Sequence, residues 1–276
     1  MNRIYNEIYV GASEPFRVIH ISDIHLTYAD ERDSEEIQAL AKKRNSGKRN
    51  NIKVLEAAAE RAARQNLPVI CTGDVMDFCS ALNIEKAEEF IRKTNCFCMT
   101  GNHDYRTGGG MKYDNAANME VNRGRVDKAF GIDTCFDSFI MNGVNFVAVN
   151  NVYYTFSPEQ YERLREEVKK GLPVILLMHV PLYAPDAFAM RCRVRNSNMG
   201  YMIDVPEELL SAYPPERYIQ QKPDEITREI TEYIKREPAV KAILTGHIHN
   251  TFDSQVTDTL KQYITGIGDI RTVKII

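Results

Sequence analysis

The sequence lacks any apolar run long enough to cross a membrane. A spanning helix needs about 20 consecutive apolar residues, and the 276 residues contain no stretch of that kind. The opening stretch, MNRIYNEIYVGASEPF (1–16), also lacks the apolar core of a secretory signal. We therefore expect a cytoplasmic protein without a membrane span.

Paired cysteines and an excess of positive charge are also missing. The six cysteines show no CxxC spacing, and the formal net charge is -3. Cys71, Cys96 and Cys98 lie in apolar runs, where a buried free thiol is the expected state, so the pattern indicates a reducing compartment. Domains that bind nucleic acid are usually more basic, and we therefore do not expect nucleic acid as a partner.

Five short apolar runs recur along the chain, and each is followed by a polar cluster. Continuous apolar runs of this length predict strands that are covered on both faces. The runs are FRVIHIS (16–22), LPVICT (67–72), CFCMT (96–100), LPVILLM (172–178) and AVKAILT (239–245). Amphipathic stretches predict helices over 51–66, 157–171 and 223–237, and Asn142-Gly143 predicts a hairpin over 138–151. Strands alternating with helices predict a layered α/β fold with a mixed sheet.

One predicted helix carries a complete set of end signals. Ser157 suits the N-cap, Pro158 the first helical position, Gln160 the capping box and Gly171 the residue after the C-cap. No composition shift marks a domain boundary, so we expect one domain over 1–276. Two excursions interrupt it, a polar one at 28–50 and a Pro-rich, aromatic-rich one at 183–222.

The polar clusters after the five runs hold most of the residues with metal-binding or catalytic chemistry. They contain His25, His103, His179, His247 and His249, together with Asp23, Asp74, Asn102 and Asp104. Ligands of α/β folds bind beyond the carboxyl ends of the strands, and a His, Asp and Asn set without cysteine suits Mn²⁺, Fe or Zn²⁺. Each cluster taken alone also fits an ordinary turn. We read His20, inside a strand, as structural, and Gly246 as the residue that lets the chain bend between the last two histidines.

Taken together, the order of these clusters resembles the motifs of the calcineurin-like metallophosphoesterase family. The motifs are Asp23-x-His25, Gly73-Asp74-x-x-Asp77, Gly101-Asn102-His103-Asp104, His179 and Gly246-His247-x-His249. The resemblance implies a four-layer α/β/β/α sandwich of two mixed sheets flanked by helices. It implies a first metal held by Asp23, His25, Asp74 and His249, and a second held by Asp74, Asn102, His179 and His247. It places His103 beside the leaving oxygen, with Asp104 orienting it and raising its pKa, and makes Asp77 a supporting residue.

The function implied by this resemblance is metal-dependent hydrolysis of phosphomonoester or phosphodiester bonds. A hydroxide that bridges two Mn, Fe or Zn ions would attack phosphorus directly. The expected partner is a small phosphorylated substrate, with a nucleotide as one option, and a pyrophosphate bond is also open. Two rival functions stay open: a nuclease of the same family, and a non-catalytic protein-binding scaffold with this fold.

The two excursions carry further charged and aromatic residues. The basic run KKRNSGKR (42–49) is expected to be a solvated helix end and loop. Arg191, Arg193 and Arg195 alternate; they would either project together toward an anionic substrate or serve as surface charges. Four tyrosines of 183–222 would either line a pocket or, as we expect, pack the excursion onto the sheets: Tyr183, Tyr201, Tyr213 and Tyr218.

Overall fold

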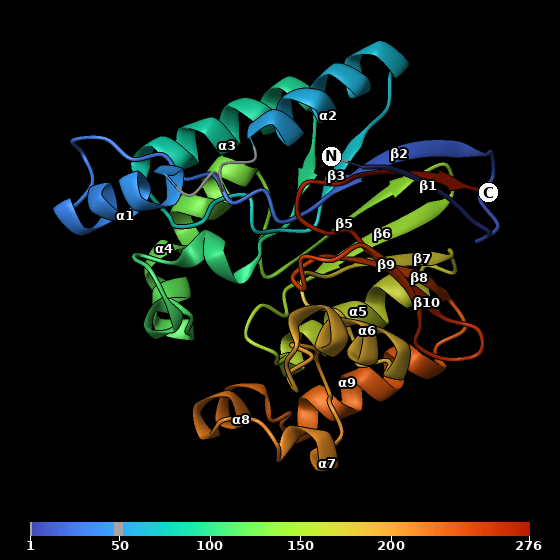
Figure 1. Ribbon diagram of the computed structural model, residues 1–276. Helices are drawn as coiled ribbons and strands as arrows, with labels where there is room; N and C mark the ends of the chain where they lie inside the picture. Colours follow the sequence, from blue (N-terminus) through green and yellow to red (C-terminus); the bar gives the residue numbers. More distant parts are fainter. Residues whose placement is uncertain (1, 47–51) are drawn as a thin grey trace.

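The computed structural model describes residues 2–46 and 52–276, and its centre is a pair of stacked mixed sheets (Figure 1). The first sheet has the strand order β1 (Arg3–Ile8), β11 (Ile270–Ile275), β2 (Phe16–Ile21), β3 (Val69–Cys71) and β4 (Phe97–Cys98). The second has the order β5 (Phe136–Met141), β6 (Val144–Val149), β7 (Val174–Leu177), β8 (Val240–Thr245), β10 (Lys261–Ile264) and β9 (Phe252–Gln255). Strands β2, β3 and β4 are mutually parallel, and so are β6, β7 and β8. Their carboxyl ends therefore meet at one edge of each sheet.

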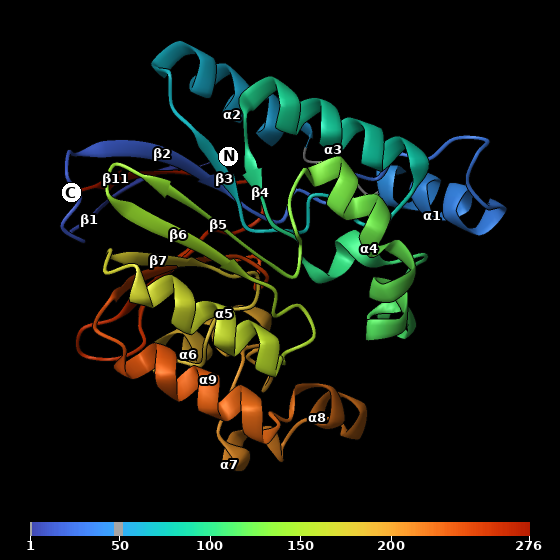
Figure 2. The same cartoon turned by 180° about the vertical axis from the view of Figure 1, so that it is seen from behind.

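Helices cover the outer face of each sheet. The first sheet is covered by α2 (Ile52–Gln65), α3 (Ala81–Thr94) and α4 (Ala116–Phe130), and the second by α5 (Pro158–Lys169) and α9 (Glu225–Arg236). Seen from behind, α5 and α9 lie beneath β6 and β7, on the opposite side from α2 and α3 (Figure 2). This is the α/β/β/α sandwich that the resemblance implied.

The apolar runs are continuous because both faces of the strands are buried. In β3, Val69 and Cys71 pack beneath the helices, whereas Ile70 between them packs into the core that separates the two sheets. In β6, Phe146 faces that inter-sheet core and Val147 faces α5 and α9. Full burial of each such side chain contributes about 1.5–3 kcal/mol, so the two-sided pattern stabilises the stack and fixes strand register.

Local end signals form as the sequence predicts. Ser157 Oγ accepts the Gln160 N–H, and Gln160 Oε1 accepts the Ser157 N–H, which completes the capping box of α5. Gly171 follows the C-cap with φ +73°. In the β5–β6 hairpin, Asn142 and Gly143 both have positive φ, of 46° and 74°, as a two-residue turn of this kind requires.

The 28–50 excursion contains a helix, α1 (Glu35–Ser46), whose end lies in the basic run as expected and whose start the sequence did not indicate. Its Ile37 and Ala41 pack against Phe78. Lys42 and Lys43 are exposed, as expected for a solvated run, and residues 47–49 of that run lie outside the described residues.

The 183–222 excursion forms α6 (Pro185–Arg195), α7 (Glu207–Leu210) and α8 (Pro215–Gln221). Its apolar side chains, among them Tyr213, form one cluster with Ile264 of β10 and with Ile248 of the loop after β8. The expected packing onto the sheets is therefore confirmed. The option that all three arginines project together is wrong, because they lie on the helix α6. Arg191 and Arg195 are four residues apart and share one side of the helix. Arg193 is exposed on another side.

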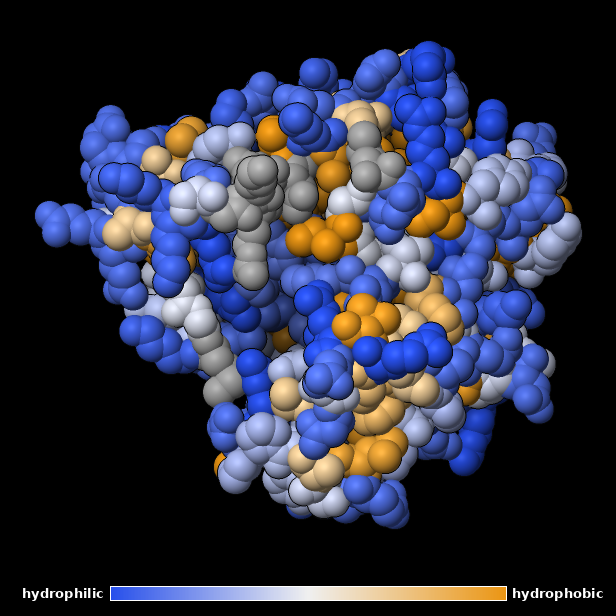
Figure 3. Space-filling model, viewed as in Figure 1, coloured by the Kyte–Doolittle hydropathy of each residue, from blue (hydrophilic) through white to orange (hydrophobic). Residues whose placement is uncertain are grey.

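All six cysteines are free, and Cys71, Cys96 and Cys98 are buried, as expected. Within residues 2–46 and 52–276, no helix combines the length and apolar character needed to cross a bilayer. The face seen in Figure 1 is mostly hydrophilic, with small groups of hydrophobic residues in both its upper and its lower half (Figure 3). The single-domain organisation over 1–276 stays a prediction.

Candidate metal centre

The loops after β2, β3 and β4 are held together by backbone hydrogen bonds and by glycines. The Asp23 N–H donates to Gly73 O at 3.0 Å, and the His25 N–H donates to Asp74 O at 2.8 Å. A Cβ on Gly73 would lie 2.3 Å from Gly101 N, and one on Gly101 would lie 2.2 Å from Asp74 Oδ1. Since real Cβ atoms do not approach so closely, glycine at both positions is what lets the second and third loops meet.

Five of the seven candidate ligands have a backbone that L-residues rarely adopt. The φ angles are 56° for Asp23, 52° for His25, 52° for Asp74, 68° for His247 and 61° for His249. Each left-handed residue costs about 1–2 kcal/mol, and such strain gathers at functional sites. The expectation that Gly246 provides the bend is therefore wrong. The two histidines bend the chain themselves, and Gly246 provides space, because a Cβ there would lie 1.8 Å from Ser22 Oγ.

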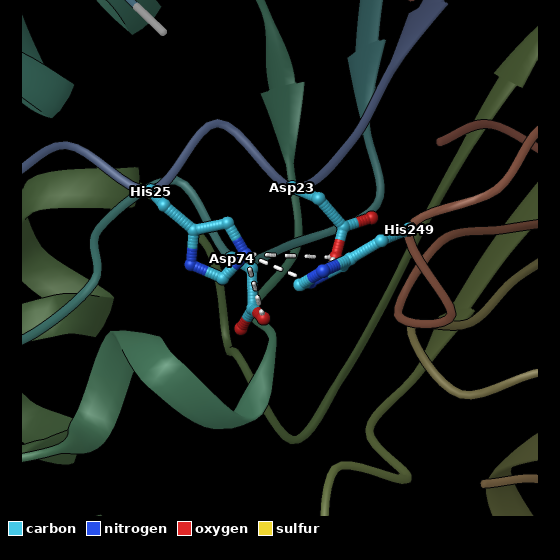
Figure 4. Close-up of side chains that lie close together, drawn as sticks. All are labelled: Asp23, His25, Asp74 and His249. Atoms are coloured by element: carbon cyan, nitrogen blue, oxygen red, sulfur yellow. Dashed lines mark hydrogen bonds and ion pairs between the residues drawn. The ribbon is translucent and has the colours of Figure 1, made fainter. Parts of the chain in front are cut away.

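The first expected ligand set comes together from three loops. Asp23, His25, Asp74 and His249 turn one ligand atom each toward a common point, with these atoms all within 4.8 Å of one another (Figure 4). His249 Nε2 lies 3.3 Å from Asp23 Oδ1 and 3.1 Å from His25 Nε2, and His25 Nε2 lies 3.7 Å from Asp74 Oδ2.

The second expected set reaches Asp74 through His179. His179 Nε2 lies 3.3 Å from Asp74 Oδ2 and 3.2 Å from His247 Nδ1. Asn102 joins Asp74 and His247 in lining one cavity. Asp74 Oδ2 thus faces a histidine of each set, while its Oδ1 accepts the His103 backbone N–H at 2.8 Å.

The donor atoms fit a pair of cations. Asp23 Oδ1 and Asn102 Oδ1 are buried oxygens without a hydrogen-bond partner, although the other polar atom of each side chain is bonded. Asp23 Oδ2 accepts the His247 N–H at 2.9 Å, and Asn102 Nδ2 donates to Asp114 Oδ1 at 2.9 Å. Leaving a buried oxygen unpaired costs about 1–3 kcal/mol. One metal ion at each set would give these two oxygens a partner. A set of nitrogen and oxygen ligands suits Mn, Fe or Zn.

The far nitrogens of the second-set histidines are held by hydrogen bonds. His179 Nδ1 lies 2.8 Å from Thr72 O, which can only accept, so Nδ1 carries a proton and Nε2 is the nitrogen that would bind a metal after losing its own proton. His247 Nε2 lies 2.9 Å from Tyr154 Oη, which leaves its Nδ1 facing the site. Each ring is thus fixed in orientation before a metal arrives.

Mutual interactions shift the pKa values of these buried groups. Burial alone would raise the pKa of Asp23, but the nearby His249, with Nε2 3.3 Å from Asp23 Oδ1, lowers it to about 2. Burial alone would lower the pKa of His179, but the charge and hydrogen bond of Asp74 raise it to about 9. Burial and the charge of His179 lower the pKa of His247. Burial would also raise the pKa of Asp74, but His179 and His103 lower it well below its usual range. The carboxylates of Asp23 and Asp74 are therefore ionised, as metal ligands must be.

His103 lies at the site, but its carboxylate partner is not the expected one. Asp77 Oδ1 lies 3.0 Å from His103 Nδ1 and 3.3 Å from His25 Nδ1. The expected contact with Asp104 is wrong: its fully buried carboxylate accepts the backbone N–H groups of Asp74, Met76 and Gly101 at 2.7–2.9 Å. Asp104 therefore shapes the loop backbone, and Asp77 orients the imidazole.

The pKa of His103 is lowered, contrary to expectation. Burial is the largest cause, and the charges of His25 and Arg106 add to it, while Asp74 and Asp77 oppose it. Arg106 Nη1 lies 2.9 Å from His103 Nδ1, and Arg106 Nη2 donates to Asp114 Oδ2 at 2.9 Å.

Several residues at the site were missed by the sequence reading. Arg44 of α1 pairs with Asp77 Oδ2 at 2.8 Å, so the basic run reaches the site at one residue. Arg106 could have been found, since it stands three residues after His103 in the same 3₁₀ turn. Tyr154 and Arg217 gave no local signal. Tyr201 is one of the four tyrosines for which pocket lining was the other option, and it does line the cavity over the site. The cavity over the site has a volume of about 180 Å³ and is lined by Asp74, Asn102, His103, Arg106, Asp114, Tyr154, Arg191, Tyr201, Arg217, His247 and His249.

The sequence profile of the calcineurin-like phosphoesterases matches residues 16–251, which spans every candidate ligand. The chain belongs to the calcineurin-like phosphoesterase family. A comparison with curated protein sequences found no match. Membership agrees with the mixed nitrogen and oxygen ligand set and makes a phosphoester hydrolase the class of enzyme to which the chain is related.

Solved structures show the same calcineurin-like phosphoesterase fold at low sequence identity. A dimetal phosphatase from Danio rerio is 12% identical with a TM-score of 0.51, and the match covers 91% of this chain and 87% of that one. The purple acid phosphatase PPD1 from yellow lupin (Lupinus luteus) seeds is 14% identical with a TM-score of 0.54; the match covers 94% of this chain but only 45% of that one. At these identities the likeness concerns the fold alone.

Proposed function

We propose that the chain is a phosphoesterase that hydrolyses small phosphate esters with the help of two metal ions. Asp23, His25, Asp74 and His249 would hold the first ion, and Asp74, Asn102, His179 and His247 the second. The observation that carries this proposal is Asp74 Oδ2, a buried carboxylate oxygen 3.7 Å from His25 Nε2 and 3.3 Å from His179 Nε2. An oxygen so placed suits a bridging ligand between two cations.

When bound, the two ions would supply a nucleophilic hydroxide near neutral pH and neutralise the phosphate oxygens. The side chains of the protein do the rest. Asp74 and Asp23 remain ionised, and His179 and His247 keep fixed orientations through Thr72 and Tyr154. Ligands fixed in this way would fix the positions of the two ions, and through them that of a bound phosphate, which would lower the entropy cost of the attack.

His103 is the group we place beside the leaving oxygen. It lines the cavity, its side chain is 16% exposed, and its Nε2 lies 4.0 Å from Asp74 Oδ2. It is thus near enough to a bound phosphate to donate to the departing oxygen, with Asp77 holding Nδ1. A bound phosphate dianion would raise the pKa of this imidazole, because negative charge favours the protonated form.

The nuclease and scaffold functions have less support than a phosphoesterase, one from the net charge and the other from the site geometry. A scaffold has no need of unpaired buried oxygens at Asp23 and Asn102, and the net charge of -3 does not favour a nucleic-acid groove. Monoesters and diesters both stay open as substrates, and the cytoplasmic location stays a prediction.

The test is hydrolysis of p-nitrophenyl phosphate and bis(p-nitrophenyl) phosphate by the purified chain, before and after chelation and after Mn²⁺ is returned. We expect hydrolysis of at least one ester that disappears with chelation and returns with Mn²⁺. Asp74→Asn should abolish it, whereas Asp258→Asn, at an exposed position, should not. Metal binding without hydrolysis of either ester, over a range of pH, would favour the scaffold.

A further inference from the structure

The excursion 183–222 places two arginines and a tyrosine over the metal ligands. Arg191 comes from α6, Tyr201 from the following loop and Arg217 from α8. All three line the 180 Å³ cavity whose floor includes Asp74, Asn102 and His247. The excursion thus supplies one wall of the site.

Tyr201 brings the two guanidinium groups close together. The Arg191 guanidinium carbon lies 5.3 Å from the centre of the Tyr201 ring, and that of Arg217 lies 5.2 Å from it. Both distances are within the range of cation–π attraction. The Tyr201 ring in turn lies 6.5 Å from the ring of His247, so the cations stand one side chain beyond the second ligand set. Tyr201 has φ 56°, a strained backbone of the kind found at binding sites.

These two charges have no acidic partner in the part of the chain that the structure describes. Arg191 Nε and Nη1 are buried without a hydrogen-bond partner, and Arg217 Nη1 donates only to the neutral Gln220 Oε1, at 2.6 Å. The nearby Asp114 is already bonded to Arg106 and Asn102, at 2.9 Å each. Two guanidinium groups beside one ring repel each other, and buried N–H groups without acceptors are costly. An anion in the cavity would relieve both penalties.

We propose that the substrate carries two linked phosphate groups. Arg191 and Arg217 bind the second phosphate, while the first lies at the metal centre. This inference rests on the proposed function and names a phosphoanhydride, rather than an ester, as the preferred substrate of the same site. The guanidinium fork matches phosphate oxygens and donates to two at once. A monoester, with its single phosphate at the ligands, would leave the arginines unpaired.

The reaction is hydrolysis of a P–O–P bond. The water oxygen forms a bond to the phosphorus held at the metal ligands, and the bond from that phosphorus to the bridging oxygen breaks. The electron pair stays on the bridging oxygen, which departs as part of the second phosphate. The two protons of water end on the two phosphate products or in solvent. Arg191 and Arg217 stabilise the negative charge that grows on the departing phosphate.

The test compares inorganic pyrophosphate with p-nitrophenyl phosphate as substrates of the full chain loaded with Mn²⁺, at matched free metal. Arg191→Gln and Arg217→Gln should lower kcat/KM for pyrophosphate at least tenfold more than for p-nitrophenyl phosphate. Arg193→Gln is the matched control, because Arg193 is exposed on the same helix, and it should change neither. Equal losses on both substrates would overturn the proposal, since the arginines would then bind the transferred phosphate. No loss on either would overturn it too.

Binding provides a readout that does not depend on turnover. Calorimetry should show methylenediphosphonate binding at least tenfold more tightly than methylphosphonate, with this advantage lost in Arg191→Gln and kept in Arg193→Gln. Equal affinities of the two phosphonates for the unchanged chain would contradict the second phosphate site. If p-nitrophenyl phosphate is hydrolysed while pyrophosphate is not preferred, only this inference fails. If neither substrate is hydrolysed and neither phosphonate binds, the proposed function fails with it.

Discussion

The carboxylate of Asp77 lies against the imidazole of His103, with Oδ1 3.0 Å from Nδ1. The same oxygen lies 3.3 Å from His25 Nδ1, and Oδ2 lies 2.8 Å from Arg44 Nε. Burial alone would raise the pKa of Asp77, but the hydrogen bonds of His103 and His25 lower it far below the usual range. Asp77 is therefore an anion that orients both a candidate metal ligand and the candidate proton donor.

Replacing this anion should weaken both neighbours at once. We expect Asp77→Asn to lower kcat/KM for p-nitrophenyl phosphate by about 10–100-fold, the usual cost of removing a group that orients a metal-bound histidine. Metal affinity should fall as well, measured by titration with Mn²⁺. Asp258→Asn serves as the control. Activity and affinity within twofold of the unchanged chain would show that the Asp77 contacts carry no function.

His103 can be tested through the basicity of the leaving group. A glycerol phosphate needs a proton on its departing alkoxide, whereas p-nitrophenolate leaves without one. We expect His103→Ala to lower turnover of glycerol 2-phosphate about 10²-fold or more, with a loss several times smaller on p-nitrophenyl phosphate and an unchanged metal content. A uniform loss on both substrates, or a loss explained by missing metal, would argue against proton donation.

Asp104 should behave as a structural residue, in contrast to His103. In Asp104→Asn an amide NH₂ would face backbone N–H groups that now donate to a carboxylate. We expect the free energy of unfolding, measured in urea, to fall by about 2–4 kcal/mol, and metal binding to weaken because the Asp74 backbone is released. A fully stable variant with only a lower kcat would restore the role first expected for Asp104.

His20 predicts how stability depends on pH. It is fully buried between Thr72 Oγ1 and Thr265 Oγ1, at 2.9 Å each. Burial, with the charge of Arg271, lowers its pKa to about 3. Between that value and the ordinary value of about 6.5 the unfolded chain binds the extra proton, so this group removes stability as the pH falls.

The size of this effect follows from about 1.4 kcal/mol per pH unit. From pH 7 to pH 5, metal-free wild type should lose about 2 kcal/mol more of its unfolding free energy than metal-free His20→Gln, in which an uncharged amide can bond to both threonines. Urea unfolding at the two pH values measures the difference. Identical pH dependence in the two proteins would mean that the pKa of His20 is the same in the folded and the unfolded chain.

The patterns in the sequence predicted the fold and the residues that come together at the candidate site. Two-sided apolar runs such as β3 mark buried strands, and the capping box at Ser157 depends on neighbours only, so both could be read directly. The order of motifs from Asp23 to His249 predicted which residues meet. The left-handed backbone of these residues could not be predicted, because it is imposed by contacts between distant loops, such as that of Gly246 with Ser22.

The errors concern partners chosen among neighbours. Asp104 is adjacent to His103 in sequence, yet the 3₁₀ turn directs its carboxylate to the backbone of another loop. Asp77, from that other loop, contacts the imidazole of His103 in its place. The alternating arginines would share one side only in an extended segment, but they lie on the helix α6. Arg217 approaches Tyr201 only because the whole excursion folds back over the ligands.

The most direct test of the central claim is anomalous diffraction from crystals of the chain loaded with Mn²⁺. We predict two anomalous peaks about 3.5–4 Å apart, one between Asp23 and His249 and one between His179 and His247, with Asp74 Oδ2 between them. A single peak, or two peaks that do not share Asp74, would contradict the dimetal centre on which the proposed function rests.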